Sequence, residues 1–96
     1  MTYKIKPTST FKKEYKLAKK RGLDLSLINE VIDLLAQGQT LPEKYNDHDL
    51  LGNYKGYREC HIQANWLLIY QYDNGNCYLY LARTGTHSDL FGKNRK

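Results

Sequence analysis

The second half of the sequence carries three histidines, the side chains best suited to proton transfer near neutral pH. They are His48, His61 and His87. Imidazole has an unperturbed pKa of ~6.5, so it accepts and donates protons under physiological conditions. Glu59 precedes His61 by two residues, and Arg83 precedes His87 by four. This set suits metal-free phosphodiester cleavage, which needs a base for the 2′-hydroxyl, an acid for the departing 5′-oxygen and a cation for the phosphate.

Other chemistry is less well supported by the spacing of these residues. None of the histidines has the short paired spacing of a zinc site, so we expect no metal and no other cofactor. Cys60 and His61 are neighbours on a predicted strand and so face opposite sides of the sheet, which favours a buried thiol over a nucleophile. From the residues alone, a purely structural role for the histidines remains open.

The elements that must position these side chains change character along the chain. Apolar residues recur at helical spacing in the first half, where Gly22 and Gly38 end two predicted helices. Alternation dominates after Tyr57, and Asn74-Gly75 indicates a hairpin. We expect an α+β fold, with an N-terminal strand and a helical hairpin packed on a twisted antiparallel sheet. The predicted strands cover 3–6, 57–62, 66–72 and 77–84, within a single domain of residues 1–92 and a basic tail of residues 93–96.

The net charge of +5 is unevenly distributed. Residues 1–21 hold eight lysines and arginines but a single acid, Glu14, and the tail adds further basic residues. Four of these residues form a predicted stripe on the first helix: Lys12, Lys16, Lys19 and Lys20. Such a stripe favours a polyanionic partner, with a solvated helix face as the alternative.

Composition also restricts the cellular setting. The longest uninterrupted apolar run, from Trp66 to Tyr70, is far shorter than the roughly 20 residues of a bilayer span. The N-terminus shows no apolar leader segment, and two cysteines make no disulfide framework. We therefore expect a cytoplasmic protein that does not contact membranes.

Four ordered blocks of the sequence resemble the YafQ branch of the RelE/ParE toxin superfamily. The resemblance extends over nearly the whole chain, including the lysine-rich first helix. The blocks are Asp47–Gly52, Gly56–Ile62, Asn65–Tyr70 and Arg83–Gly92.

The resemblance implies a RelE-like fold and the toxin of a type II toxin–antitoxin pair. It implies a ribosome-dependent endoribonuclease that cleaves mRNA without a metal, and a cognate antitoxin as partner. Position by position, the residues that match active-site or motif positions of the family are His48, His61, His87, Phe91 and Trp66, with Glu59 at an acidic position and Arg83 at a basic one.

These matches lead to specific expected roles. His87 is the expected general acid and His48 the general base, while His61 and Glu59 orient that base. Arg83 is expected to stabilise charge on the phosphate. The expected RNA contacts are Phe91, which stacks on a base, together with Trp66, Lys12, Lys16, Lys19 and Lys20.

One position departs from the family pattern. Relatives often carry aspartate before the motif tryptophan, whereas this chain has Asn65, whose amide cannot act as a base. Two other functions stay open at this point: a toxin of the ParE type that acts on DNA gyrase, and a non-catalytic module that binds RNA or the ribosome.

Overall fold

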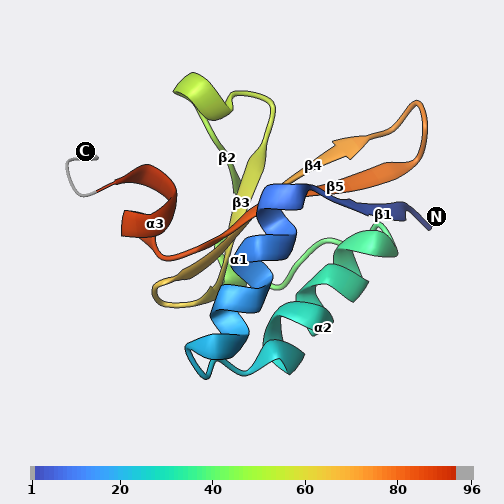
Figure 1. The fold of residues 1–96 in the computed structure, drawn as a ribbon. Helices are drawn as coiled ribbons and strands as arrows, with labels where there is room; N and C mark the ends of the chain where they lie inside the picture. Colours follow the sequence, from blue (N-terminus) through green and yellow to red (C-terminus); the bar gives the residue numbers. More distant parts are fainter. Residues whose placement is uncertain (1, 93–96) are drawn as a thin grey trace.

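The computed structural model describes residues 2–92, which form a sheet covered by two long helices (Figure 1). The basic tail at 93–96 lies outside the described residues, and the domain boundary at residue 92 stays a prediction. The strands are β1 (Lys4–Pro7), β2 (His48–Asp49), β3 (Arg58–Gln63), β4 (Trp66–Asp73) and β5 (Tyr78–Gly85). The helices are α1 (Ser9–Lys20), α2 (Leu25–Ala36) and α3 (His87–Phe91), with 3₁₀ turns at Glu43–Tyr45 and Gly52–Tyr54.

The sheet has the strand order β1-β5-β4-β3-β2. The predicted antiparallel arrangement of β3, β4 and β5 is confirmed, and β4 is the middle strand of the sheet. The sheet as a whole is mixed, because β1 pairs with β5 in parallel while β2 adds a short antiparallel edge to β3. The α+β fold is thus confirmed, with one parallel pair that the periodicity of the sequence did not indicate.

The long helices end where the sequence indicates, and a side-chain cap marks the start of each. The Thr8 hydroxyl caps α1 by accepting a hydrogen bond from the backbone N–H of Phe11, and the Asp24 carboxylate caps α2 in the same way. Gly22 and Gly38 then adopt positive φ, which ends each helix. None of the helices in the described part of the chain has the length and apolar run that crossing a bilayer requires.

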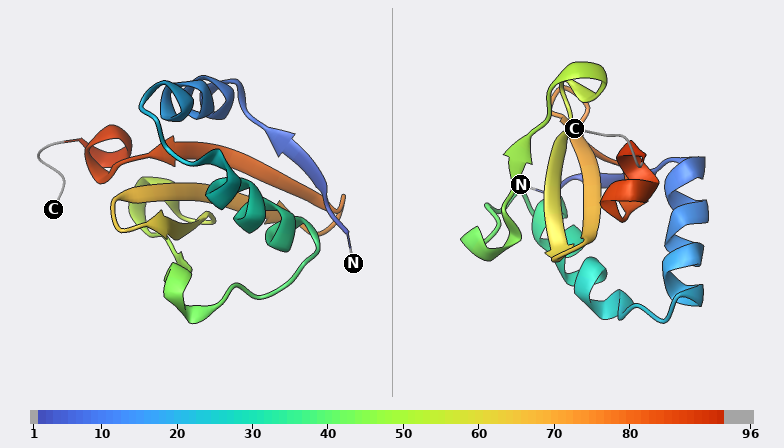
Figure 2. Two further views of the ribbon diagram at one scale, coloured as in Figure 1. Left: turned by 90° about the horizontal axis from the view of Figure 1, so that it is seen from below. Right: turned by 90° about the vertical axis from the view of Figure 1, so that its left-hand side faces the viewer.

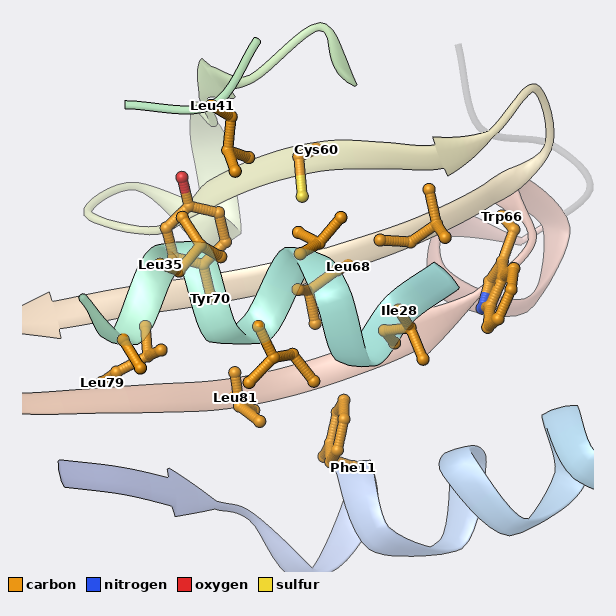
Figure 3. Close-up of a cluster of buried hydrophobic side chains, with 14 of the residues drawn as sticks. Phe11, Ile28, Leu35, Leu41, Cys60, Trp66, Leu68, Tyr70, Leu79 and Leu81 are labelled. Carbon is orange, nitrogen blue, oxygen red and sulfur yellow. The ribbon is translucent and has the colours of Figure 1, made fainter. Parts of the chain in front are cut away.

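Apolar side chains are buried on both faces of the sheet. The face beneath α1 and α2 carries the larger core, in which Leu68 and Tyr70 of β4 pack against Ile28 and Leu35 of α2 (Figure 3). On the other face, Leu67 and Ile69 are fully buried although no long helix covers them. Because these strand residues alternate, β4 needs apolar cover on each side.

The short helix α3 supplies part of that cover at one end of the sheet (Figures 1 and 2). Its Leu90 packs on Leu67 and Ile69. A capping box joins Thr86 and Asp89, and Arg21 at the end of α1 donates to the Asp89 carboxylate over 2.7 Å. Gly85 permits this return of the chain, since a Cβ there would lie 2.9 Å from the Cβ of Asp89.

The hydrogen bonds that Arg21 and Thr86 make to Asp89 cause the free energy of unfolding to depend on pH in the acid range. Hydrogen bonds from Arg21, followed by those from Thr86, hold the pKa of Asp89 at about 2. Because the pKa of Asp89 is lower in the folded than in the unfolded state, where it is ~3.9, the ionised carboxylate stabilises the fold above that pH. This contribution is lost as the pH falls towards 2. Asp89→Asn should therefore lower the free energy of unfolding most above about pH 4, with the difference from wild type shrinking below it.

Urea unfolding between about pH 2.5 and 6 measures this difference. Asp33→Asn, at an exposed carboxylate of α2, is the matched control. A wild-type advantage over Asp89→Asn that stays constant across this range would contradict the prediction.

Candidate active site

The strand register places the expected catalytic residues on the sheet face opposite α1 and α2. His48 pairs with Glu59, Glu59 with Ile69, and Ile69 with Arg83, so these positions form one row across four strands. His61 lies in the neighbouring row, opposite Leu67. Four segments that are far apart in the sequence thereby meet on one surface.

Glu59 is the centre of a cluster of imidazoles. Its carboxylate is nearly buried and lies 3.2 Å from His61 Nε2 and 4.0 Å from His48 Nε2. The His61 ring is 5.6 Å from the His87 ring and 6.3 Å from the His48 ring, measured between centroids. The structure therefore brings together His48, Glu59, His61 and His87, as the sequence predicts.

Asn65 determines the orientation and tautomer of His87. The Asn65 side-chain oxygen accepts hydrogen bonds from the His87 backbone N–H, at 3.2 Å, and from His87 Nδ1, at 2.9 Å. A backbone N–H can only donate, so the Asn65 atom must be its oxygen, and Nδ1 must carry a proton. Nε2 of His87 is consequently the nitrogen left for reaction. Asn65 thus positions His87 without exchanging a proton.

His48 is held in a similar way by the loop that precedes it. Its Nδ1 lies 2.8 Å from the backbone carbonyl oxygen of Asn46, which can only accept, so Nδ1 carries the proton and Nε2 points towards Glu59. Arg58 of β3 fixes the two neighbours of His48, binding Asp47 at 3.0 Å and Asp49 at 2.5 Å. This positioning by Arg58 was missed from the sequence, where its only signal is an arginine on a strand near an Asp-His-Asp run.

A β-bulge turns Arg83 towards the site. The β4–β5 register shifts so that Ile69 pairs with Arg83 while Tyr70 pairs with Leu81, leaving Ala82 as the extra residue. Without this shift, strict alternation would place Arg83 on the same face as Leu81, within the core beneath the helices. Arg83 instead binds Glu14 of α1, a contact that the sequence did not reveal.

The two aromatic residues expected to bind RNA have different environments. Phe91 is half-buried, packs edge-on against Tyr54 at 5.8 Å and lines a groove of ≈ 580 Å³ beside Leu51. Trp66 is buried in the core beneath the helices (Figure 3). Its indole N–H donates a hydrogen bond to the Thr84 hydroxyl. Contacts with the core account for the burial of this ring, and the predicted contact between Trp66 and RNA stays a prediction.

The expected lysine stripe lies outside the histidine cluster. Lys12, Lys16, Lys19 and Lys20 are exposed on α1, and Glu14 is the acidic residue of that helix. The four lysines form a separate surface, and no contact among the described residues brings them to the imidazoles.

The cluster also contains the ligand types of a metal site. Single ligand atoms of Glu59, His61 and His87 lie within 4.8 Å of one another. Two imidazoles and a carboxylate are ligands that zinc accepts, although the sequence spacing did not indicate this grouping.

Cys60 is fully buried on the other face and burial raises the pKa of its thiol, as expected for a packing residue.

A family model described as the bacterial toxin of type II toxin–antitoxin systems, YafQ, matches residues 3–92. The chain belongs to this YafQ toxin family. It is 39% identical to the mRNA interferase toxin YafQ of Escherichia coli K12, over 92% of this chain and 95% of that protein. The resemblance identified in the sequence is thus confirmed.

Solved structures agree with this assignment. The toxin in the crystal structure of the E. coli DinJ–YafQ complex superimposes with a TM-score of 0.87 at 38% identity, covering 96% of this chain and all of that one. A structure described as a metal-bound toxin from Helicobacter pylori gives a TM-score of 0.88 at 42% identity, covering 95% of this chain and 100% of that one. The fold is therefore that of solved YafQ-like toxins.

The role of Asn65 is open to direct test. Asn65→Ala should release the His87 ring, so that the Nε2–H tautomer gains population at the expense of Nδ1–H. Asn65→Asp keeps an oxygen acceptor in the same place and should retain the Nδ1–H form. Imidazole ¹⁵N chemical shifts distinguish the two tautomers. Unchanged His87 shifts in Asn65→Ala would show that Asn65 does not orient the ring.

Proposed function

We propose that this toxin is a ribosome-dependent endoribonuclease that cleaves mRNA by attack of a 2′-hydroxyl, with histidines as acid and base. The observation that carries this proposal is the convergence of three imidazoles on the Glu59 carboxylate. For two of them, His48 and His87, Nδ1 is occupied by a fixed acceptor and Nε2 is left for the substrate. The relative named an mRNA interferase toxin supports the same activity.

The proposed reaction follows from these positions. Nε2 of His48 takes the proton of the 2′-hydroxyl, whose oxygen then attacks phosphorus. The bond from phosphorus to the 5′-oxygen breaks, and that oxygen receives a proton from Nε2 of His87, which must enter the reaction as the imidazolium, with Nδ1–H bonded to Asn65 and a second proton on Nε2. The products are a 2′,3′-cyclic phosphate and a 5′-hydroxyl, so all atoms and protons are accounted for without a metal.

The remaining residues support the charge and position of the reacting groups. His61 lies between the other two imidazoles and next to Glu59, where it orients the base. Arg83 stabilises the charge that builds on the phosphate oxygens. Phe91 borders the groove next to α3 and offers a partly exposed ring for stacking on a base.

The two other functions considered from the sequence are less well supported. A gyrase-directed toxin of the ParE type or a non-catalytic RNA-binding module has no need for imidazoles held with Nε2 free. The arrangement of His48 and His87 favours catalysis over both.

We further propose three partners: the ribosome, its mRNA and a cognate antitoxin. A groove of ≈ 390 Å³ runs beside α1, lined by Ile5, Phe11 and Ile32 and bordered by Lys12 and Lys16. Its apolar floor and basic rim suit an acidic amphipathic segment of an antitoxin. The E. coli relative crystallised with the antitoxin DinJ supports such a partner.

The acid–base assignment predicts a separation of binding from chemistry. Replacing a proton-transfer residue typically costs ~10²–10⁴-fold in rate. His87→Ala should therefore lose most mRNA cleavage in a reconstituted translation system while keeping its affinity for ribosomes, because one imidazole contributes little to a large electrostatic interface. Cys77→Ser should retain full cleavage as a control.

The chemistry of the products provides an independent check on the same prediction. The upstream fragment should end in a 2′,3′-cyclic phosphate or a 3′-phosphate. An mRNA with a 2′-O-methyl group at the cut site should resist cleavage, and chelators should leave the rate unchanged once the magnesium needed by the ribosome is restored. Cleavage of the methylated mRNA would exclude 2′-hydroxyl attack.

The lysine stripe predicts a salt-dependent interaction with ribosomal RNA. A variant with alanine at Lys12, Lys16, Lys19 and Lys20 should bind ribosomes more weakly, and its slope of log affinity against log salt should fall by about one unit for each lost phosphate contact. Sedimentation binding at several salt concentrations measures both. Lys55→Ala, at an exposed lysine outside α1, is the control. Unchanged affinity and slope would indicate a solvated helix face.

A further inference from the structure

The edge of β5 is only partly covered by its parallel neighbour. β1 pairs with β5 from Tyr78 to Leu81 and ends at Pro7. The hydroxyl of the next residue, Thr8, donates a hydrogen bond to the backbone carbonyl of Ala82. Beyond this point the outward backbone N–H of Thr84 has no strand partner, and the Glu14 carboxylate of α1 accepts it at 3.1 Å.

The same carboxylate binds Arg83 from the side. Glu14 Oε2 lies 3.2 Å from Nε and 2.5 Å from Nη2 of Arg83. The Glu14 and Arg83 side chains are 15% and 28% exposed, so this ion pair, in which Oε2 accepts from both Nε and Nη2, is partly shielded from solvent. Glu14 is also the acidic residue among the many lysines of α1, so its charge is opposite to the positive charge of the rest of the helix.

These contacts restrict which part of Arg83 can reach a substrate. Of the five guanidinium N–H groups, Glu14 accepts one from Nε and one from Nη2, and the carbonyl of Asp89 accepts another from Nη2 at 3.4 Å. Nη1 donates to the Tyr54 hydroxyl at 3.3 Å. Among the contacts of residues 2–92, one Nη1–H is therefore left for a substrate.

We propose that Glu14 is a positioning residue for Arg83, whose side-on pairing fixes the guanidinium beside α3 so that its remaining Nη1–H and its charge meet the scissile phosphate. This inference rests on the proposed endoribonuclease activity. It assigns a second task to the lysine-rich helix α1: the helix presents lysines outwards and one carboxylate inwards to the active site.

Glu14→Gln separates positioning from a purely structural role. Glutamine keeps an oxygen that can accept the Thr84 N–H, but it lacks the charge and the second acceptor that Arg83 requires. Glu30→Gln is the matched control, because it removes the same charge from an exposed site on α2. The variants to be compared are Glu14→Gln, Arg83→Ala, their double mutant and Glu30→Gln.

We expect Glu14→Gln to lower the single-turnover cleavage rate on saturating ribosome–mRNA complex about tenfold, less than the ~10²–10³-fold cost of losing a direct transition-state donor, because Arg83 itself remains. In the Arg83→Ala background the same change should have no further effect, since Glu14 acts through Arg83. Glu30→Gln should cleave like wild type. Equal losses in both backgrounds, an unchanged rate or a faster rate in Glu14→Gln would each overturn the proposal.

A spectroscopic measurement tests the contact without relying on activity. The Arg83 Nε–H should exchange slowly with solvent in the wild type and in Glu30→Gln, and rapidly in Glu14→Gln. Rapid exchange in the wild type would overturn the positioning role. If Arg83→Ala cleaves normally while the Nε–H is protected, the proposed role of Arg83 in cleavage fails, and with it the link from Glu14 to the reaction. If Arg83→Ala is impaired but Glu14→Gln is not, only the inference about Glu14 fails.

Discussion

The central strand β4 must be buried on both of its faces, and the architecture of the site follows from that constraint. Helices α1 and α2 cover one face, where Leu68 and Tyr70 lie. On the other face Leu67 and Ile69 are fully buried, and Leu90 of α3 packs on them. Burial of each such side chain contributes about 1.5–3 kcal/mol, which holds a five-residue helix that would not be stable alone. His87 begins that helix and Phe91 ends it, so the apolar contact that completes the core also delivers two site residues.

Hydrogen bonds then orient the histidines that the packing of the core brings to the site. Both His48 and His87 have Nδ1 tied to an oxygen that only accepts in this arrangement, so their Nε2 atoms face the cluster around Glu59. Arg58 holds the loop around His48, while the Thr86–Asp89 capping box and Arg21 hold the helix that carries His87. The imidazoles are thus positioned by local hydrogen bonds on rigid elements, which is the condition for acid–base chemistry at fixed distances.

Much of this arrangement was predictable, because it depends on periodicity and capping. The helix ends at Gly22 and Gly38, the turn at Asn74-Gly75 and the apolar run from Trp66 to Tyr70 all follow from local residue patterns. The placement of Glu59 and His61 on one face of β3 also follows from alternation, whereas the short strand β2 that brings His48 to Glu59 was not predicted. The burial of Trp66 did not follow, since alternation alone does not say which face of β4 lies beneath α1 and α2.

The bulge at Ala82 and the Glu14–Arg83 pair were not predictable for a related reason. A bulge inserts one residue without a sequence signature, and it changes the face of every residue after it. The pair joins residues 69 positions apart, whose proximity depends on how far β1 extends along β5. Such long-range contacts are set by the assembled sheet rather than by any local segment.

The position of α3 in the chain has a consequence for the order in which the toxin becomes complete. All other described elements precede it, so a growing or truncated chain that stops before residue 86 contains the sheet and both long helices but lacks His87 and Phe91. Such a chain would also leave Leu67 and Ile69 without the apolar cover of Leu90. Addition of α3 therefore completes the second core cluster and the active site together, and a chain that lacks α3 lacks both.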